Sequence, residues 1–248
     1  MEYNPPMFTF DTVGIIHSCF KEKFGIPRQP GLVPAARAVL ELLPPYNREE
    51  AVRGLEGFSH IWITFVFHTR LGEQWSPMVR PPRLGGNRRA GVFATRSPLR
   101  PNPIGLSAVK LEKIEAAAGS VRLHLQGVDL LDGTPVLDIK PYLPYSDSIA
   151  AATGGYAPEA PAAAFEVNFS QEALAACAAA RDQAPELELL IRQILAQDPR
   201  PAYYGKGGGK QAFGMRLSGC EVKWEVDGDR VRVTDIIRAD DQVYNQQP

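Results

Sequence analysis

Residues 106–131 read LSAVKLEKIEAAAGSVRLHLQGVDLL, and this stretch decides the fold class of the N-terminal half. Apolar and polar residues alternate over 106–115 and again over 120–131, which is the two-residue period of a β-strand with one buried face. The AAAGS segment between the two runs is short and turn-like. The stretch is therefore predicted to form an antiparallel β-hairpin.

Three more segments upstream are typical of strands, because they are rich in β-branched and aromatic residues. They are FTFDTVGII (8–16), FSHIWITFVFH (58–68) and GVFAT (91–95). We expect a mainly β fold whose first domain, residues 1–160, is a single closed barrel-like sheet, since closure leaves no open strand edges.

The composition changes at residues 149–164, where IAAATGGYAPEAPAAA is typical of a linker or a long surface excursion. Beyond it, Ser170 can cap a helix over QEALAACAAA, and Pro185 can open a second helix that must stop at Asp198 because Pro199 follows. Three strand-like pieces then follow, two of them separated by the Asp227-Gly228 turn. We expect a small α+β domain over residues 161–248.

The second helix has apolar residues at helical spacing, which predicts one buried stripe. Its members are Leu187, Leu190, Ile191, Ile194 and Leu195.

The overall composition excludes several classes of protein. The chain has 248 residues, 44% of them hydrophobic, and a formal net charge of −1, so a nucleic-acid or membrane partner would have to bind a local patch. The three cysteines, Cys19, Cys177 and Cys220, are far apart, which fits reduced thiols better than a disulfide framework or a zinc site. The sequence shows no signal peptide or membrane span, and a cytoplasmic protein is expected.

A local positive field lies between Glu73 and Glu112, where no acidic residue occurs. This window contains Arg80, Arg83, Arg88, Arg89, Arg96, Arg100 and Lys110. It is either a solvated loop or a surface that neutralises phosphates, and the excess of arginine over lysine favours planar, bidentate recognition.

Inside this window, RSPLRPNPIG (96–105) contains three prolines. Each proline fixes its own φ and pushes the preceding residue toward extended backbone. Arg100 and Asn102 are therefore expected to project from a stiff ribbon that holds them in fixed places.

Two other segments carry polar groups in an unusual pattern. After the Asp132-Gly133 turn, Asp138, Lys140 and Tyr142 alternate and should face one side of a strand, either as a simple surface ion pair or as the lining of a pocket. In DPRPAYYGK (198–206), Arg200, Tyr203 and Tyr204 suit an unstacked base and its phosphates, although tyrosines packed under a helix would read the same way.

Several familiar motifs are missing from the sequence. It has no G-x-G-x-x-G after a strand, GKGGGK (205–210) lacks the spacing of a phosphate loop, and there is no G-x-S-x-G elbow. The histidines are scattered without metal-ligand spacing, so no metal is expected.

Taken together, four segments resemble the TsaA/TrmO family. They are PRQPGL (27–32), PPRLGGNRRAGVFATRSPLRPNPIGLS (81–107), DLLDGTPVLDIKPYLPY (129–145) and DPRPAY (198–203). The similarity covers nearly the whole chain. Members of the family are S-adenosylmethionine-dependent tRNA methyltransferases built on a β-barrel, which would account for the absent glycine motif.

The resemblance implies N6-methylation of N6-threonylcarbamoyladenosine next to the anticodon of a threonine-accepting tRNA, by a homodimer. It also assigns cofactor contacts, which fall on Pro27, Arg28, Gln29, His68, Thr69, Arg96, Leu106, Asp129, Leu130, Leu131 and Asp132.

The residues themselves indicate a mechanism. Arg96 or Arg28 can bind the carboxylate of the methyl donor, while Leu106 and the leucines of DLLD supply apolar walls. We hypothesise that Asp138, oriented by Lys140, accepts the proton of the acceptor nitrogen. Contacts to the modified base and its carboxylate are expected from Arg100, Asn102, Tyr142, Arg200 and Tyr203. Two alternatives stay open at this point: a non-catalytic RNA-binding barrel, and a methyltransferase with a small-molecule or protein substrate.

Overall fold

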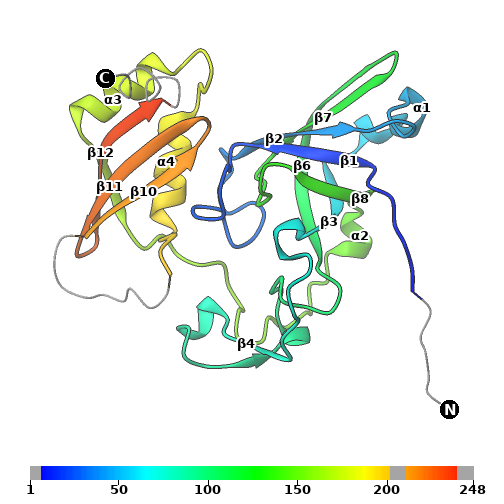
Figure 1. Cartoon of the computed structure of the whole chain (residues 1–248), viewed down its shortest axis with the longest axis horizontal. Helices are drawn as coiled ribbons and strands as arrows, with labels where there is room; N and C mark the ends of the chain where they lie inside the picture. The colour runs from blue at the N-terminus through cyan, green and yellow to red at the C-terminus, as the bar shows by residue number, and fades with distance from the viewer. Residues whose placement is uncertain (1–6, 202–210, 239–248) are drawn as a thin grey trace.

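The computed structural model describes residues 7–201 and 211–238 and contains a closed six-stranded barrel (Figure 1). The order of strands around the barrel is β1-β2-β7-β6-β3-β8, and all neighbours are antiparallel. The strands are β1 (Gly14–Ser18), β2 (Arg37–Leu42), β3 (His60–Val66), β6 (Ile104–Ala117), β7 (Ser120–Gln126) and β8 (Thr134–Pro141). The predicted mainly β fold with a closed barrel is confirmed.

The hairpin predicted over 106–131 is formed by β6 and β7. Ala117 pairs with Ser120 across the turn, and the register continues to Lys110 opposite Gln126. The first half of β6 pairs with β3, so this one 14-residue strand joins two sides of the barrel. The inward residues of β7, Val121, Leu123 and Leu125, are buried, as the alternation predicts.

Two strand predictions need correction. The first strand begins at Gly14 and not at Phe8, because Phe8 and Phe10 are 74% and 65% exposed and have no neighbouring strand to cover them. The segment 91–95 is mostly a 3-10 turn over Val92–Ala94, closed by the Thr95 hydroxyl, which donates to the Val92 carbonyl (2.8 Å). Strand β2 was not predicted from the sequence.

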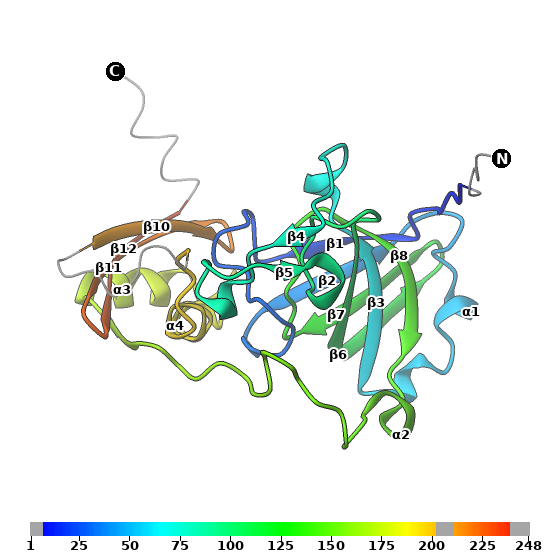
Figure 2. The same ribbon diagram turned by 90° about the horizontal axis from the view of Figure 1, so that it is seen from below.

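A long excursion connects β3 to β6. It contains only one short antiparallel pair, β4 (Met78–Val79) with β5 (Ala90–Gly91), and 3-10 turns (Figure 2). Two short helices, α1 (Glu49–Val52) and α2 (Pro144–Asp147), lie elsewhere in the barrel unit.

The C-terminal unit is a small α+β structure, as expected. Its four-stranded sheet has the order β10-β11-β12-β9, with α3 and α4 packed against it (Figure 1). The elements are β9 (Glu166–Phe169), α3 (Gln171–Ala179), α4 (Leu187–Ala196), β10 (Gln211–Leu217), β11 (Cys220–Asp227) and β12 (Arg230–Arg238). Strand β9, which is parallel to β12, was not predicted.

Both helix predictions are confirmed, with a shift at one end. The Ser170 hydroxyl accepts from the Ala173 amide (3.0 Å) and caps α3. The apolar stripe of α4 is at most 4% exposed, although the helix begins at Leu187, two residues after the proline.

One hydrophobic core runs through both units. Residues 19–36, which connect β1 to β2 and are called here the 19–36 loop, lie against the C-terminal sheet. Phe20 of this loop is 1% exposed and forms an isolated bridge with Leu217 of β10. The barrel therefore packs firmly on the C-terminal unit at this loop.

Candidate functional site

A cavity of about 460 Å³ opens on the barrel beside the 19–36 loop. Its walls are drawn from four parts of the chain: residues 23–29, 62–70, 95–107 and 129–134. Its volume is in the range of small-molecule sites.

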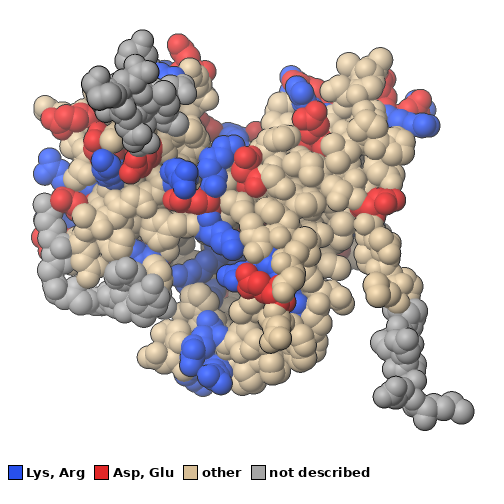
Figure 3. All heavy atoms as spheres, in the orientation of Figure 1, with Lys and Arg blue, Asp and Glu red and all other residues tan. Residues whose placement is uncertain are grey.

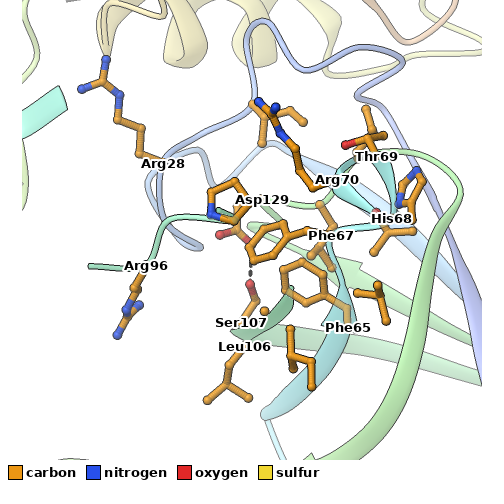
Figure 4. A pocket seen from close by; sticks show the side chains of 18 of the residues that line it. Arg28, Phe65, Phe67, His68, Thr69, Arg70, Arg96, Leu106, Ser107 and Asp129 are labelled. Atoms are coloured by element: carbon orange, nitrogen blue, oxygen red, sulfur yellow. Dashed lines mark hydrogen bonds between the residues drawn. The ribbon is translucent and has the colours of Figure 1, made fainter. Parts of the chain in front are cut away.

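Aromatic rings form one wall of this cavity. Phe65 and Phe67 meet edge to face with their ring centroids 5.0 Å apart (Figure 4). Gly105 on β6 makes room for Phe65, because a Cβ built there would lie 2.2 Å from Cζ of Phe65. A glycine is therefore required at this position of the strand.

A partly buried carboxylate faces the rings. Asp129 accepts a hydrogen bond from the hydroxyl of Ser107 (2.6 Å), which is itself buried (Figure 4). Burial raises the pKa of Asp129 to about 6, against the opposing effects of the Ser107 hydrogen bond and the positive charge of Arg96. The cavity thus holds a carboxylate that a bound cation would stabilise in its ionised form.

Basic side chains lie across the cavity from the rings. Figure 4 shows Arg28 and Arg96 on one side, with Asp129 between them and the aromatic wall. The guanidinium of Arg96 donates to Oε1 of Gln29. Burial lowers the pKa of Arg28, and the negative charge of Asp198 acts in the opposite direction.

The proline ribbon also borders the cavity. Arg100 lines it, and its Nη1 donates to the Thr95 carbonyl (3.0 Å), so this arginine also fixes the loop that carries Arg96. Asn102 is exposed and does not line the cavity.

Most of the residues that the family resemblance assigned to a cofactor lie together here. Those that line the cavity are Pro27, Arg28, Gln29, His68, Thr69, Arg96, Leu106, Asp129, Leu130 and Leu131. Asp132 does not, because its carboxylate accepts from the Ser18 amide (2.9 Å) and pairs with Lys21 (2.9 Å).

Asp138 and Lys140 do not line this cavity, so within a single chain the hypothesised proton acceptor lies outside the cavity that Arg96 lines. In the barrel register Asp138 lies opposite Thr64, which lies opposite Leu106. Two strand spacings put Asp138 about 10 Å from Leu106. Asp138 pairs with Lys140 and borders a second cavity of about 490 Å³.

Tyr142 and Arg200 are also held outside the cavity. The ring of Tyr142 packs on Trp62 with centroids 5.7 Å apart. The side chain of Arg200 is 8% exposed, bonds both oxygens of Asp198 (2.7 and 2.9 Å) and lies over the ring of Phe165. Tyr203 is outside the described residues.

Sequence reasoning missed several residues of the site. They include Phe65, Phe67, Arg70 and Ser107. The alternation in 58–68 and 106–115 places such residues on strands, but only the closure of the barrel brings the ends of those strands together.

Lysine and arginine side chains gather at two places on the face shown in Figure 3. One is the groove between the C-terminal unit and the barrel, and the other is the lobe around β4. Within residues 7–201 and 211–238, no helix has the length and apolar character needed to cross a membrane, and no cluster of metal-ligating side chains was found.

Comparison with known proteins agrees with this architecture. The chain is 52% identical over 220 residues to the tRNA (adenine(37)-N6)-methyltransferase of Escherichia coli K12, covering 88% of this chain and 93% of that protein. It is 49% identical over 140 residues to the mouse protein of the same name, and the match covers 56% of this chain and 31% of the mouse protein. A crystal structure of TrmO from Pseudomonas aeruginosa superposes with a TM-score of 0.78 at 44% identity. The match covers 93% of this chain and 98% of that one.

Two family models match the chain in sequence order. The tRNA-methyltransferase O N-terminal domain matches residues 15–148, which include the barrel strands except for Gly14, and the TrmO C-terminal domain matches residues 162–239. Because the two matches together span most of the sequence and agree with the fold, the chain belongs to the tRNA-methyltransferase O family.

Proposed function

We propose that this chain is an S-adenosylmethionine-dependent methyltransferase that acts on N6 of N6-threonylcarbamoyladenosine next to the anticodon of a threonine-accepting tRNA. The observation that carries the proposal is a single cavity that is lined by a partly buried carboxylate, two arginines and an aromatic wall. Family membership supports the same activity.

The chemistry of the cavity fits the methyl donor. The donor is an amino acid with a carboxylate and an ammonium group, joined through a sulfonium to adenosine. Arg28 and Arg96 suit the carboxylate, and Asp129 suits a positive group. The Phe65 and Phe67 rings provide apolar surface, and an aromatic face also attracts a cation. When bound, the cofactor supplies an electrophilic methyl group.

The acceptor nitrogen needs help from the protein, because its lone pair is delocalised into a carbonyl and its proton must leave. We retain Asp138, oriented by Lys140, as the proposed proton acceptor. Since Asp138 lies outside the cavity of its own chain, this role requires a second copy to bring it to a cavity.

A homodimer is proposed for this reason. The outward face of the barrel carries Leu106 and Ile104, which are 53% and 38% exposed and border the cavity. Asp138 lies in the same cross-strand row as Leu106. A second copy covering this face would remove apolar surface from water and could complete each site with the partner's carboxylate.

Mixing two variants tests this arrangement, at a cofactor concentration at which Asp129→Asn alone gives no measurable turnover. In a dimer of one Asp129→Asn chain with one Asp138→Asn chain, a site shared between chains leaves one site intact, and activity returns. If each site were built from a single chain, both sites would be damaged and the mixture would stay inactive. Methyl transfer to tRNA is the measurement, with each variant alone as the control.

For the tRNA, we propose that the positive window of the excursion binds phosphates, and that Arg100 and Asn102 contact the threonyl carboxylate. Arg100 already lines the cavity. Its substitution by alanine should reduce the preference for threonylcarbamoylated tRNA over unmodified tRNA, whereas an equal loss on all RNAs would indicate phosphate contact alone. A tRNA substrate implies a cytoplasmic enzyme.

The function as a whole is tested with labelled S-adenosylmethionine. We expect methyl incorporation into threonine-accepting tRNA that carries threonylcarbamoyladenosine, and none into the same tRNA without it. A chain that binds RNA but gives no calorimetric signal with the cofactor would be a binding module and would refute the proposal.

A further inference from the structure

The 19–36 loop forms part of the cavity wall, and the same loop is bound to the C-terminal unit. Lys23, Ile26, Pro27, Arg28 and Gln29 all line the cavity. The same loop is fastened to the C-terminal unit at its start, its middle and its end.

The start of the loop pairs with β10, the edge strand of the C-terminal sheet. The Cys19 carbonyl accepts from the Ser218 amide (2.9 Å). The carboxylate of Glu22 accepts from the Arg216 amide (2.8 Å), and its other oxygen lies 3.6 Å from Nε of the same arginine. Backbone and side chain therefore both tie this end to β10 and its turn.

The middle of the loop packs on the same sheet. The ring of Phe24 is nearly parallel to Trp224, which is fully buried, with centroids 6.4 Å apart. Gly25 has φ +90°, and a Cβ there would lie 3.1 Å from Sδ of Met215. The backbone thus touches the C-terminal unit only two residues before Pro27.

The end of the loop is fixed by helix α4. Oε1 of Gln193 accepts from the Ala35 amide (2.8 Å), and the contact is partly buried. Arg37, which follows at the start of β2, donates to Glu186 (2.7 Å). The barrel adds its own bond, from the Gly31 amide to the Gly127 carbonyl (2.8 Å).

We propose that the C-terminal unit takes part in cofactor binding, because it holds the 19–36 loop in the shape that presents Pro27, Arg28 and Gln29 to the cavity. Glu22 and Gln193 are then positioning residues, which act through the loop without touching the ligand. The inference rests on the proposed function, in which this cavity binds S-adenosylmethionine. A loop that is less ordered beforehand must be ordered on binding, and affinity falls accordingly.

The test is a calorimetric titration of the full-length double variant Glu22→Ala/Gln193→Ala with S-adenosylmethionine. We expect the dissociation constant to rise roughly tenfold, as the loss of two ordinary hydrogen bonds to one loop would cause.

Two further variants separate positioning from simple damage. Arg192→Ala is the matched control, because this neighbour on α4 bonds Glu188 and the Val167 carbonyl within the C-terminal unit. It should bind cofactor as the wild type does. Glu22→Gln keeps an acceptor for the Arg216 amide, so Glu22→Gln/Gln193→Ala should recover part of the lost affinity.

Unchanged cofactor affinity in a folded double variant would overturn the inference. Should the double variant not fold, Glu22→Ala alone gives the same decision, with an expected rise of a few-fold. A wild-type chain that binds no S-adenosylmethionine would overturn the proposed function and this inference with it, whereas equal affinities in wild type and variant overturn the inference alone.

Discussion

At the scale of single residues, Asp129 destabilises the folded protein at neutral pH and is proposed to bind a positive group of the cofactor. Its carboxylate is partly buried beside Ser107, and its pKa in the folded protein is about 6, above the ordinary value of 3.8. The folded state therefore binds the proton more tightly than the unfolded state does. Protonation of Asp129 therefore stabilises the folded state. This stabilisation is fully present below pH 3.8 and is lost as the pH rises through about 6.

Asp129→Asn should stabilise the protein and weaken its function. Asparagine keeps an acceptor for the Ser107 hydroxyl but carries no buried charge, so the free energy of unfolding at pH 7.5 should rise by about 1–3 kcal/mol. Affinity for S-adenosylmethionine should fall at least tenfold, because a charge-assisted contact is lost. Denaturant titration and calorimetry measure the two effects, and a loss of stability at pH 7.5 would contradict the interpretation.

The same carboxyl predicts how cofactor affinity depends on pH. Only the ionised form pairs with a positive ligand, so affinity should increase from pH 5 to pH 7 and level off above the pKa of Asp129. Calorimetry across this range checks the prediction. In Asp129→Asn the rise should disappear, whereas in Asp138→Asn it should stay.

At the scale of elements, β3 and β6 show how strand pairing shapes the site. Phe65 can lie over β6 only because Gly105 has no side chain. Gly105→Ala should displace the ring and destabilise the barrel by about 1–3 kcal/mol, as overpacking does. A denaturation curve measures this cost, and the weaker aromatic wall should also lower cofactor affinity. Gly57→Ala is a suitable control, because a Cβ there meets nothing within 4 Å.

The sequence predicted best those elements whose pattern is local. Alternation identified the β6 and β7 hairpin, and helical spacing identified the stripe of α4. Strands β2 and β9 were missed because their own sequence signal is short, six and four residues, and only pairing with β1, β7 and β12 defines them. Segment 91–95 has a strand-like composition but folds as a turn, since Phe93 is 77% exposed and only Val92 is buried.

The site was predicted through its sequence motifs more than through its geometry. Motif resemblance named residues such as Arg96, Leu106 and Asp129, which the barrel brings to one cavity. Alternation alone placed Asp138 and Lys140 on one face of a strand but could not tell which surface that face would meet. Phe65 and Phe67 have the composition of ordinary strand residues. The role of Phe65 depends on Gly105 opposite it, and Phe67 lines the cavity just after the end of β3, where it packs on the Phe65 ring.

At the scale of the whole molecule, the shared core joins the two units. Phe20 and Ile26 of the barrel unit pack with Leu217 and Trp224 of the C-terminal unit in one continuous cluster. Thermal unfolding of the full chain should therefore give a single transition by calorimetry and by circular dichroism. Two separated transitions would contradict this.

A fragment of residues 1–160 provides a further test of the same feature. It would expose the apolar side chains that the C-terminal unit covers, among them Phe20, so it should self-associate or unfold at a lower temperature than the full chain. Sedimentation and thermal melting measure both effects. A monomeric fragment as stable as the full chain would show that the shared core contributes little.

The fastening of the 19–36 loop also has a thermodynamic consequence. A tRNA that contacts the C-terminal unit, as the basic groove between this unit and the barrel favours (Figure 3), would order this loop and lower the conformational entropy that is still lost when S-adenosylmethionine binds. Thermodynamic linkage is reciprocal. The factor by which S-adenosylmethionine raises the affinity for tRNA therefore equals the factor by which tRNA raises the affinity for S-adenosylmethionine. The two ligands would then bind cooperatively. The enzyme with one ligand bound would have a higher affinity for the other.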